Sequence, residues 1–211
     1  MPGTMSCIAH NTHDGRAVLL STHHVIFGEG AAKGSALSVV EIVDGRHVFH
    51  PIGRSLYGKL GILRFDNDDY YVDCAVASCE RPDLLRDKTV CAGSAFPATF
   101  AGFSRAKIGS RVTKIGAATG ITTGIVVDLN YSDTLSRRTH TPKQILIRPT
   151  EGYSAFSAEG DSGALIIDDA NQVVGLLWGT NCRGEGVACH IAPVLLAMNI
   201  KLNVTPAFCF G

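Results

Sequence analysis

Residues 158–167 read AEGDSGALII, a turn of small residues followed directly by an apolar, β-branched segment. This pattern predicts a tight loop that leads into a strand, with Ser162 held at the edge of the loop. Gly160 and Gly163 carry no Cβ, so the backbone can come close to whatever Ser162 faces. Serine alone is a weak nucleophile, so a catalytic role requires a base and an orienting acid elsewhere in the chain. An ordinary surface turn is the other interpretation of this short motif.

The composition indicates a compact protein and does not favour a polyanion as its partner. The chain has 211 residues, 45% of them apolar and 18% charged, enough for one large all-β domain or two small ones. Its 19 Lys and Arg balance its 19 Asp and Glu, so we expect no nucleic acid and no membrane surface as partners. Residues 1–4 lack the features of a signal peptide, which predicts a cytoplasmic protein, or a secreted one if a leader was removed.

The cysteines predict free thiols rather than a metal site. There are seven of them, an odd number, and their spacing matches no zinc pattern with four ligands. Mostly buried thiols in a reducing compartment are the first interpretation. Cys182 and Cys189 bracket a glycine-rich loop, and they are the pair whose position suits a disulfide in an oxidising environment.

The apolar residues occur in short runs about ten residues apart, separated by Gly, Asp and Asn, which is typical of a β-sandwich or barrel. Residues 81–105 are irregular and are interpreted as the connection between two halves. A helix is predicted at residues 192–199, with Pro193 in its first turn. Strands are predicted at residues 6–10, 16–20, 36–43, 46–50, 60–65, 70–77, 111–115, 124–130, 144–149, 164–167, 173–178 and 186–191.

Two further residues complete a catalytic arrangement with Ser162. His24 follows the exit of a predicted strand, and Asp73 stands inside the apolar run VDCAVA, residues 72–77. A carboxylate buried in such a run is costly unless it is paired or hydrogen-bonded. The chain order His, Asp, Ser is one of the known orders of a serine-protease triad.

Six segments carry a resemblance to a known family. Four of them resemble the chymotrypsin/trypsin-like serine peptidases: LSTHHV (20–25), DCAV (73–76), GDSG (160–163) and VGLLWG (174–179). Two more are similar to segments of the bacterial, streptogrisin-like branch of that family: VTKIGAATGITTG (112–124) and GVACHIAPVL (186–195).

The resemblance implies an all-β fold of two six-stranded Greek-key barrels and a short C-terminal helix, with residues 1–100 and 101–211 as the two domains. It implies a serine endopeptidase with Ser162 as nucleophile and His24 as general base and then acid. Asp73 would hold the tautomer of His24, and the N–H groups of Gly160 and Ser162 would form the oxyanion hole. No cofactor and no metal are implied.

The sequence departs from the family pattern around the specificity pocket. Phe156 stands six residues before Ser162, where trypsin-type enzymes carry an Asp, which implies a non-basic residue at the cleavage site. The resemblance implies a pocket that takes an apolar or small residue, or one that Phe156 itself fills. Its lining would be Phe156, Ser157, Trp178, Gly179, Gly186 and Ala188.

The activation of the animal enzymes by a newly released N-terminus cannot be assumed from this sequence. The Ile-Val-Gly-Gly start whose new N-terminus pairs with the Asp before the nucleophile is missing, so Asp161 needs another partner that the sequence does not identify. Glu159 is interpreted as a solvated residue at the rim of the oxyanion hole.

Several alternatives remain open. His23 competes with His24 for the role of base, although neighbours on a strand face opposite ways. One alternative is that the fold serves as a silent binding module, and another is that the peptidase cleaves one dedicated partner protein. A metal site is the least supported alternative, and its ligands would come from His23, His24, His50, Cys74 and Cys79.

Overall fold

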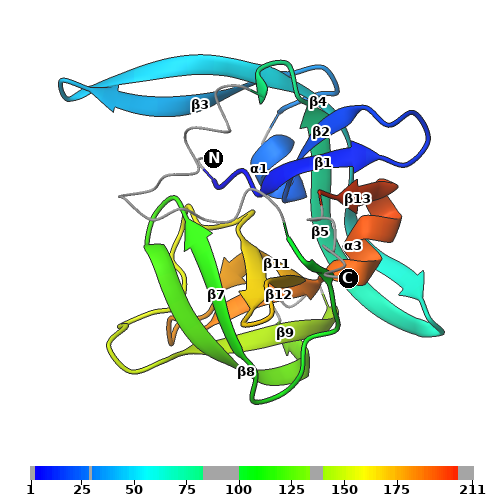
Figure 1. Cartoon of the computed structure of the whole chain (residues 1–211), viewed down its shortest axis with the longest axis vertical. Helices are drawn as coiled ribbons and strands as arrows, with labels where there is room; N and C mark the ends of the chain where they lie inside the picture. The colour runs from blue at the N-terminus through cyan, green and yellow to red at the C-terminus, as the bar shows by residue number, and fades with distance from the viewer. Residues whose placement is uncertain (1–2, 29, 83–99, 134–139, 204–211) are drawn as a thin grey trace, which may run out of the picture.

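The structure is a computed structural model that describes residues 3–28, 30–82, 100–133 and 140–203. Two β-sheets lie side by side, and a C-terminal helix packs at their junction (Figure 1). No helix in these described ranges is both long and apolar enough to cross a membrane.

The first sheet contains six antiparallel strands in the order β13-β1-β2-β5-β4-β3. Two of its hairpins have two-residue turns in which both residues are left-handed: Asp44 with Gly45, and Asp66 with Asn67. Such turns match the twist of the flanking strands, and Asn, Asp and Gly tolerate them best. The strands are β1 (Cys7–Asn11), β2 (Ala17–Ser21), β3 (Ala36–Val43), β4 (Arg46–Phe65), β5 (Asp68–Ser78) and β13 (Ile200–Leu202).

The second sheet closes into a barrel. Its order is β10-β7-β8-β9-β12-β11, and β10 also pairs with β11, so these six strands form a ring. β6 lies parallel to β11 outside that ring. The strands are β6 (Gly102–Phe103), β7 (Arg111–Gly116), β8 (Gly120–Asp133), β9 (Thr141–Pro149), β10 (Leu165–Asp168), β11 (Gln172–Thr180) and β12 (Gly186–His190).

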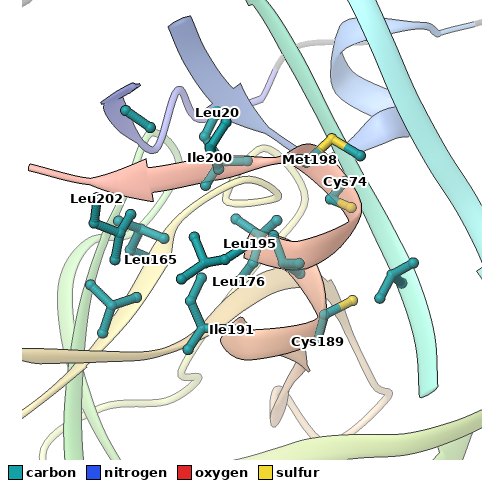
Figure 2. Packing of buried hydrophobic residues seen from close by; sticks show 14 of the residues in the cluster. Leu20, Cys74, Leu165, Leu176, Cys189, Ile191, Leu195, Met198, Ile200 and Leu202 are labelled. Carbon is teal, nitrogen blue, oxygen red and sulfur yellow. The ribbon is translucent and has the colours of Figure 1, made fainter. Parts of the chain in front are cut away.

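Two helices are described, the single turn α1 (His23–Ile26) and the longer α3 (Ile191–Met198). α3 ends at Asn199, which is left-handed with φ 49° and thereby turns the chain into β13. Figure 2 shows Ile191 and Leu195 of α3 packed beside Leu176 of β11. This hydrophobic cluster takes residues from both sheets and from α3, so it joins the two halves of the molecule.

The all-β, two-barrel prediction with a short C-terminal helix is confirmed. The predicted strands at residues 46–50 and 60–65 are parts of the single long strand β4, which contains an irregularity between Ser55 and Tyr57. β6, β13 and α1 were not predicted. The predicted connection at residues 81–105 lies largely outside the described residues. The division at residues 100 and 101 stays a prediction.

We expect Leu176→Ala to lower the free energy of unfolding by about 2–5 kcal/mol, because this fully buried side chain lies in the shared cluster and its loss leaves a cavity. Urea unfolding measures the change. Leu196→Ala is the matched control, since Leu196 on α3 is 53% exposed and its truncation should change stability by less than about 0.5 kcal/mol. Equal effects of the two substitutions would contradict the assignment of this core.

Candidate active site

His24 and Asp73 are in direct contact. Asp73 lies on β5 with 3% of its surface exposed, and its Oδ2 is 2.6 Å from Nδ1 of His24. Its other oxygen, Oδ1, accepts the backbone N–H groups of His23 at 2.6 Å and of His24 at 3.3 Å. These donors satisfy the buried carboxylate, which explains how an apolar strand tolerates it. An ionised carboxylate can only accept, so Nδ1 of His24 is the nitrogen that carries the proton toward Asp73, and in the neutral imidazole Nε2 is then the nitrogen with the lone pair.

The side chain of His23, in the same helical turn, makes different contacts from that of His24. Its ring stacks on Phe27, with centroids 5.0 Å apart. A Cβ added at Gly58 would lie 2.8 Å from Cδ2 of His23, so the ring packs closely over β4 at that glycine. His23 and His24 belong to α1 rather than to a strand, and the helical turn is what directs their side chains apart. The sequence argument from opposite strand faces is therefore wrong in its geometry.

The loop that carries Ser162 is built around two left-handed glycines, Gly160 with φ 99° and Gly163 with φ 101°. A Cβ at Gly163 would overlap the carbonyl of Thr4 and the hydroxyl of Ser21, so glycine is required there. Ser21 ends β2 only three residues before His24. This close approach brings the Ser162 loop and the His24–Asp73 pair to the same junction between the sheets.

The hydroxyl of Ser162 donates a hydrogen bond to the carbonyl of Trp178 at 3.1 Å. Among the described residues, no hydrogen bond joins Ser162 to His24. Free enzymes often show long or misaligned catalytic hydrogen bonds that tighten when substrate binds.

Asp161, beside Ser162, forms an ion pair with Lys114 of β7, and both side chains are fully buried. The Asp161 Oδ2 atom lies 2.9 Å from Nζ of Lys114 and accepts the Thr119 hydroxyl at 2.6 Å. Oδ1 accepts the N–H groups of Ala118 at 2.9 Å and of Thr119 at 3.1 Å. Asp161 also closes its own loop, because Oδ2 accepts the N–H of Ala158 at 3.0 Å. Lys114 is thus the partner that the sequence left unidentified.

The pKa values of the pair follow from burial and from these contacts. Burial alone would raise the pKa of Asp161, but the Thr119 and Lys114 hydrogen bonds and the Lys114 charge outweigh it and hold that pKa below its usual value. Burial lowers the pKa of Lys114, and the Asp161 carboxylate opposes that change. We therefore assign Asp161 as ionised and the pair as charged at neutral pH.

Phe156 lies inside the second barrel with none of its surface exposed. Its ring occupies the space between two glycines: a Cβ at Gly124 would lie 2.8 Å from Cδ2, and a Cβ at Gly186 would overlap the ring. The backbone carbonyl of Phe156 accepts the Thr122 hydroxyl at 2.6 Å, which holds the backbone of Phe156 to β8. Of the other residues predicted to line a pocket, Ala188 is buried in the same cluster.

The remaining predicted pocket residues lie along β11 and the segment that faces it. Ser157 is buried, and its carbonyl accepts the Thr180 hydroxyl at 3.1 Å. The indole of Trp178 is 5% exposed and donates to Oε1 of Gln144 at 2.6 Å, so it packs away from solvent. A Cβ added at Gly179 would meet no atom within 4 Å, so open space adjoins β11 there.

The cysteines and histidines of the described residues do not gather into a metal site. No group of three or more His, Cys, Asp or Glu within the described ranges is placed to hold a metal ion. Cys182 is exposed and Cys189 is buried, and both are free thiols. Cys189 accepts the backbone N–H of Asp73 at 3.3 Å. Burial, and secondarily the charge of Asp73, raises the pKa of the Cys189 thiol well above its ordinary value, so it stays protonated.

We expect Lys114→Met to lower the free energy of unfolding by about 3–5 kcal/mol, because it leaves the Asp161 carboxylate buried without its counter-charge. Urea unfolding at neutral pH measures the effect. Lys143→Met removes the exposed pair with Asp68, whose atoms are 3.2 Å apart, and should cost less than about 1 kcal/mol. A small effect of Lys114→Met would mean that the pair does not stabilise the loop.

The chain was compared with known families, curated proteins and solved structures. No family model matches the chain, and no curated protein matches it in sequence. Among solved structures it is similar to the Nocardiopsis protease NAPase, with 21% identity, 95% of this chain and 92% of that chain covered, and a TM-score of 0.58. It is also similar to a glutamic acid specific serine protease, with 16% identity, coverage of 95% and 92%, and a TM-score of 0.57. A third similar structure is Cellulomonas bogoriensis chymotrypsin, with 18% identity, coverage of 97% and 100%, and a TM-score of 0.55. The chain therefore has the fold of the bacterial chymotrypsin/trypsin-like serine proteases.

Proposed function

We propose that this chain is a serine endopeptidase that acts through His24, Asp73 and Ser162. The observation that carries the proposal is the 2.6 Å contact between Nδ1 of His24 and a buried, fully hydrogen-bonded Asp73. That contact leaves Nε2 of His24 as a neutral base on a side chain that is 31% exposed, beside the loop of Ser162. A buried carboxylate that orients a partly exposed imidazole is the arrangement that general-base catalysis requires.

In this mechanism Nε2 of His24 takes the proton of Ser162 as Oγ attacks the scissile carbonyl carbon. The C–N bond then breaks, and the same nitrogen gives the proton to the leaving amine, which leaves an acyl-enzyme on Ser162. In the second half of the reaction, water attacks the acyl carbon while Nε2 of His24 takes its proton. The bond to Oγ then breaks, the proton returns to Ser162, and the carboxylic acid product is released. Asp73 stays ionised and stabilises the imidazolium that forms in each half of the reaction.

The N–H groups of Gly160 and Ser162 are proposed to bind the oxyanion. The left-handed Gly160 and the anchored Asp161 give the loop a fixed shape before substrate arrives. Donors held in advance cost no reorganisation at the transition state, and loss of one such donor slows related enzymes by roughly 10²–10³-fold.

For the substrate we propose a protein or peptide with a small, uncharged residue at the cleavage position. Phe156 fills the space between Gly124 and Gly186, so little depth is left there for a long side chain. Within the described residues of this pocket wall, no carboxylate replaces the Asp that trypsin-type enzymes use for Arg or Lys. A shallow pocket restricts the sequences that can be cleaved, which supports a restricted or dedicated protein substrate.

A catalytically silent binding module is the second candidate. Two observations favour it: the Ser162 hydroxyl is bonded to the Trp178 carbonyl, and the Phe156 ring occupies the pocket region. Both are compatible with an enzyme whose serine turns on substrate binding, so reactivity of Ser162 separates the two candidates.

Labelling with a fluorophosphonate probe tests the proposed function. We expect the wild type to be labelled, and Ser162→Ala and His24→Ala to lose labelling, because the nucleophile or its base is removed. His23→Ala is the matched control, since His23 stacks on Phe27 and should leave labelling unchanged. A folded wild type that the probe does not label, alone or with candidate substrates, would favour the binding module.

Substrate preference is tested with two peptidyl phosphonates that differ only in the residue entering the pocket, alanine or leucine. We expect the wild type to react faster with the alanine probe, and Phe156→Ala to shift the leucine-to-alanine rate ratio upward by roughly tenfold or more as the pocket deepens. Phe103→Ala, which truncates a 53% exposed ring on β6, should leave the ratio unchanged. A wild type that prefers leucine would show that Phe156 does not limit the pocket.

A further inference from the structure

The segment before β1 lies against the back of the Ser162 loop. The N-terminal segment passes between α1 and the second barrel (Figure 1). The N–H of Thr4 donates to the carbonyl of Ser162 at 2.8 Å, and the hydroxyl of Ser6 donates to the carbonyl of Gly163. Residues that lie far apart in the chain, 157 positions for Ser6 and Gly163, are thereby joined at the site.

Every polar group of Thr4 is used at this junction. Its hydroxyl donates to the carbonyl of Gly160 at 3.0 Å and accepts the N–H of Ala117 at 2.9 Å. Its own carbonyl accepts the hydroxyl of Ser21 at 2.7 Å. Thr4 thus connects the end of β2, the turn between β7 and β8, and the loop that contains Ser162.

The bond to Gly160 acts on the proposed oxyanion hole. Gly160 is a left-handed glycine, and a glycine has more accessible backbone conformations than any other residue. Its N–H belongs to the Glu159–Gly160 peptide plane, which lies between two held points: the Gly160 carbonyl bonded to Thr4 and the Ala158 N–H bonded to Asp161. These two anchors together limit how that peptide plane can turn. The Thr4 hydroxyl supplies that restraint from one side of the loop, while Asp161 anchors it from the other.

We propose that Thr4 is a positioning residue that holds the N–H of Gly160 toward the oxyanion. This inference rests on the proposed peptidase function, because it assigns a role to a hole that only acyl transfer uses. The hydroxyl is the essential feature, since valine has the same branched shape but can neither donate to Gly160 nor accept from Ala117.

The test is the saturation kinetics of fluorophosphonate labelling in the full chain. We expect Thr4→Val to lower the maximal labelling rate about tenfold, a fraction of the effect of deleting an oxyanion donor, with little change in the half-saturating probe concentration. Thr4→Ser keeps the hydroxyl and should label within about twofold of the wild-type rate. A general loss of structure would not separate the maximal rate from half-saturation in this way.

Thr12→Val is the matched control. Thr12 follows β1, and its hydroxyl also donates to a carbonyl, that of Asn199 at 3.0 Å, away from the Ser162 loop. Its labelling should equal that of the wild type. Thr4→Ala gives the same comparison with less bulk if valine prevents folding.

The outcomes are distinguishable. A wild type that labels while Thr4→Val or Thr4→Ala labels equally fast overturns the role of Thr4 and leaves the proposed function intact. Equal slowing by Thr4→Ser or by Thr12→Val also overturns it, because the effect would then not depend on the hydroxyl or on its place. A folded wild type that is never labelled overturns both the role of Thr4 and the proposed peptidase.

Discussion

The fully buried ion pair between Lys114 and Asp161 is the constraint on which the site depends. Two charges without access to water are stable only when each is compensated, and here the Thr119 hydroxyl and three backbone N–H groups complete the carboxylate shell. Asp161 cannot leave this position without stranding a charge, and Ser162 is the next residue. The pair therefore specifies one conformation of the loop rather than simply adding stability.

A second buried carboxylate, Asp73, obeys the same rule by different means. It uses neutral backbone donors and one imidazole instead of a cation, so its oxygens are satisfied while the imidazole keeps a free nitrogen. The backbone N–H of Asp73 reaches across to Cys189 of the other sheet. Polar groups are thus concentrated where the two sheets meet. The apolar cluster around α3 packs next to that junction (Figure 2).

The sequence was sufficient for features that are local or that follow chain order. The alternating strands, the helix at α3 and the buried position of Asp73 could be predicted because hydrophobic pattern and the cost of burying a charge determine them. The partner of Asp161 could not, because Lys114 lies 47 residues away and comes close through the pairing of β7 with β10, the strand that follows the Asp161 loop. The position of the Phe156 ring likewise depends on glycines in two other strands, which no local pattern reveals. No motif in the sequence pointed to the role of Thr4.

The placement of β13 has a consequence for how the molecule holds together. β13 comes from the end of the described chain yet pairs with β1, while Thr4 comes from its beginning and bonds to the loop of the second barrel. Each half therefore contributes a segment that completes the other half. A cut between the halves would leave one sheet without its last strand and the other without its anchor, so folding and unfolding should be a single cooperative event. The junction that would carry the chemistry is therefore complete only when both halves are folded.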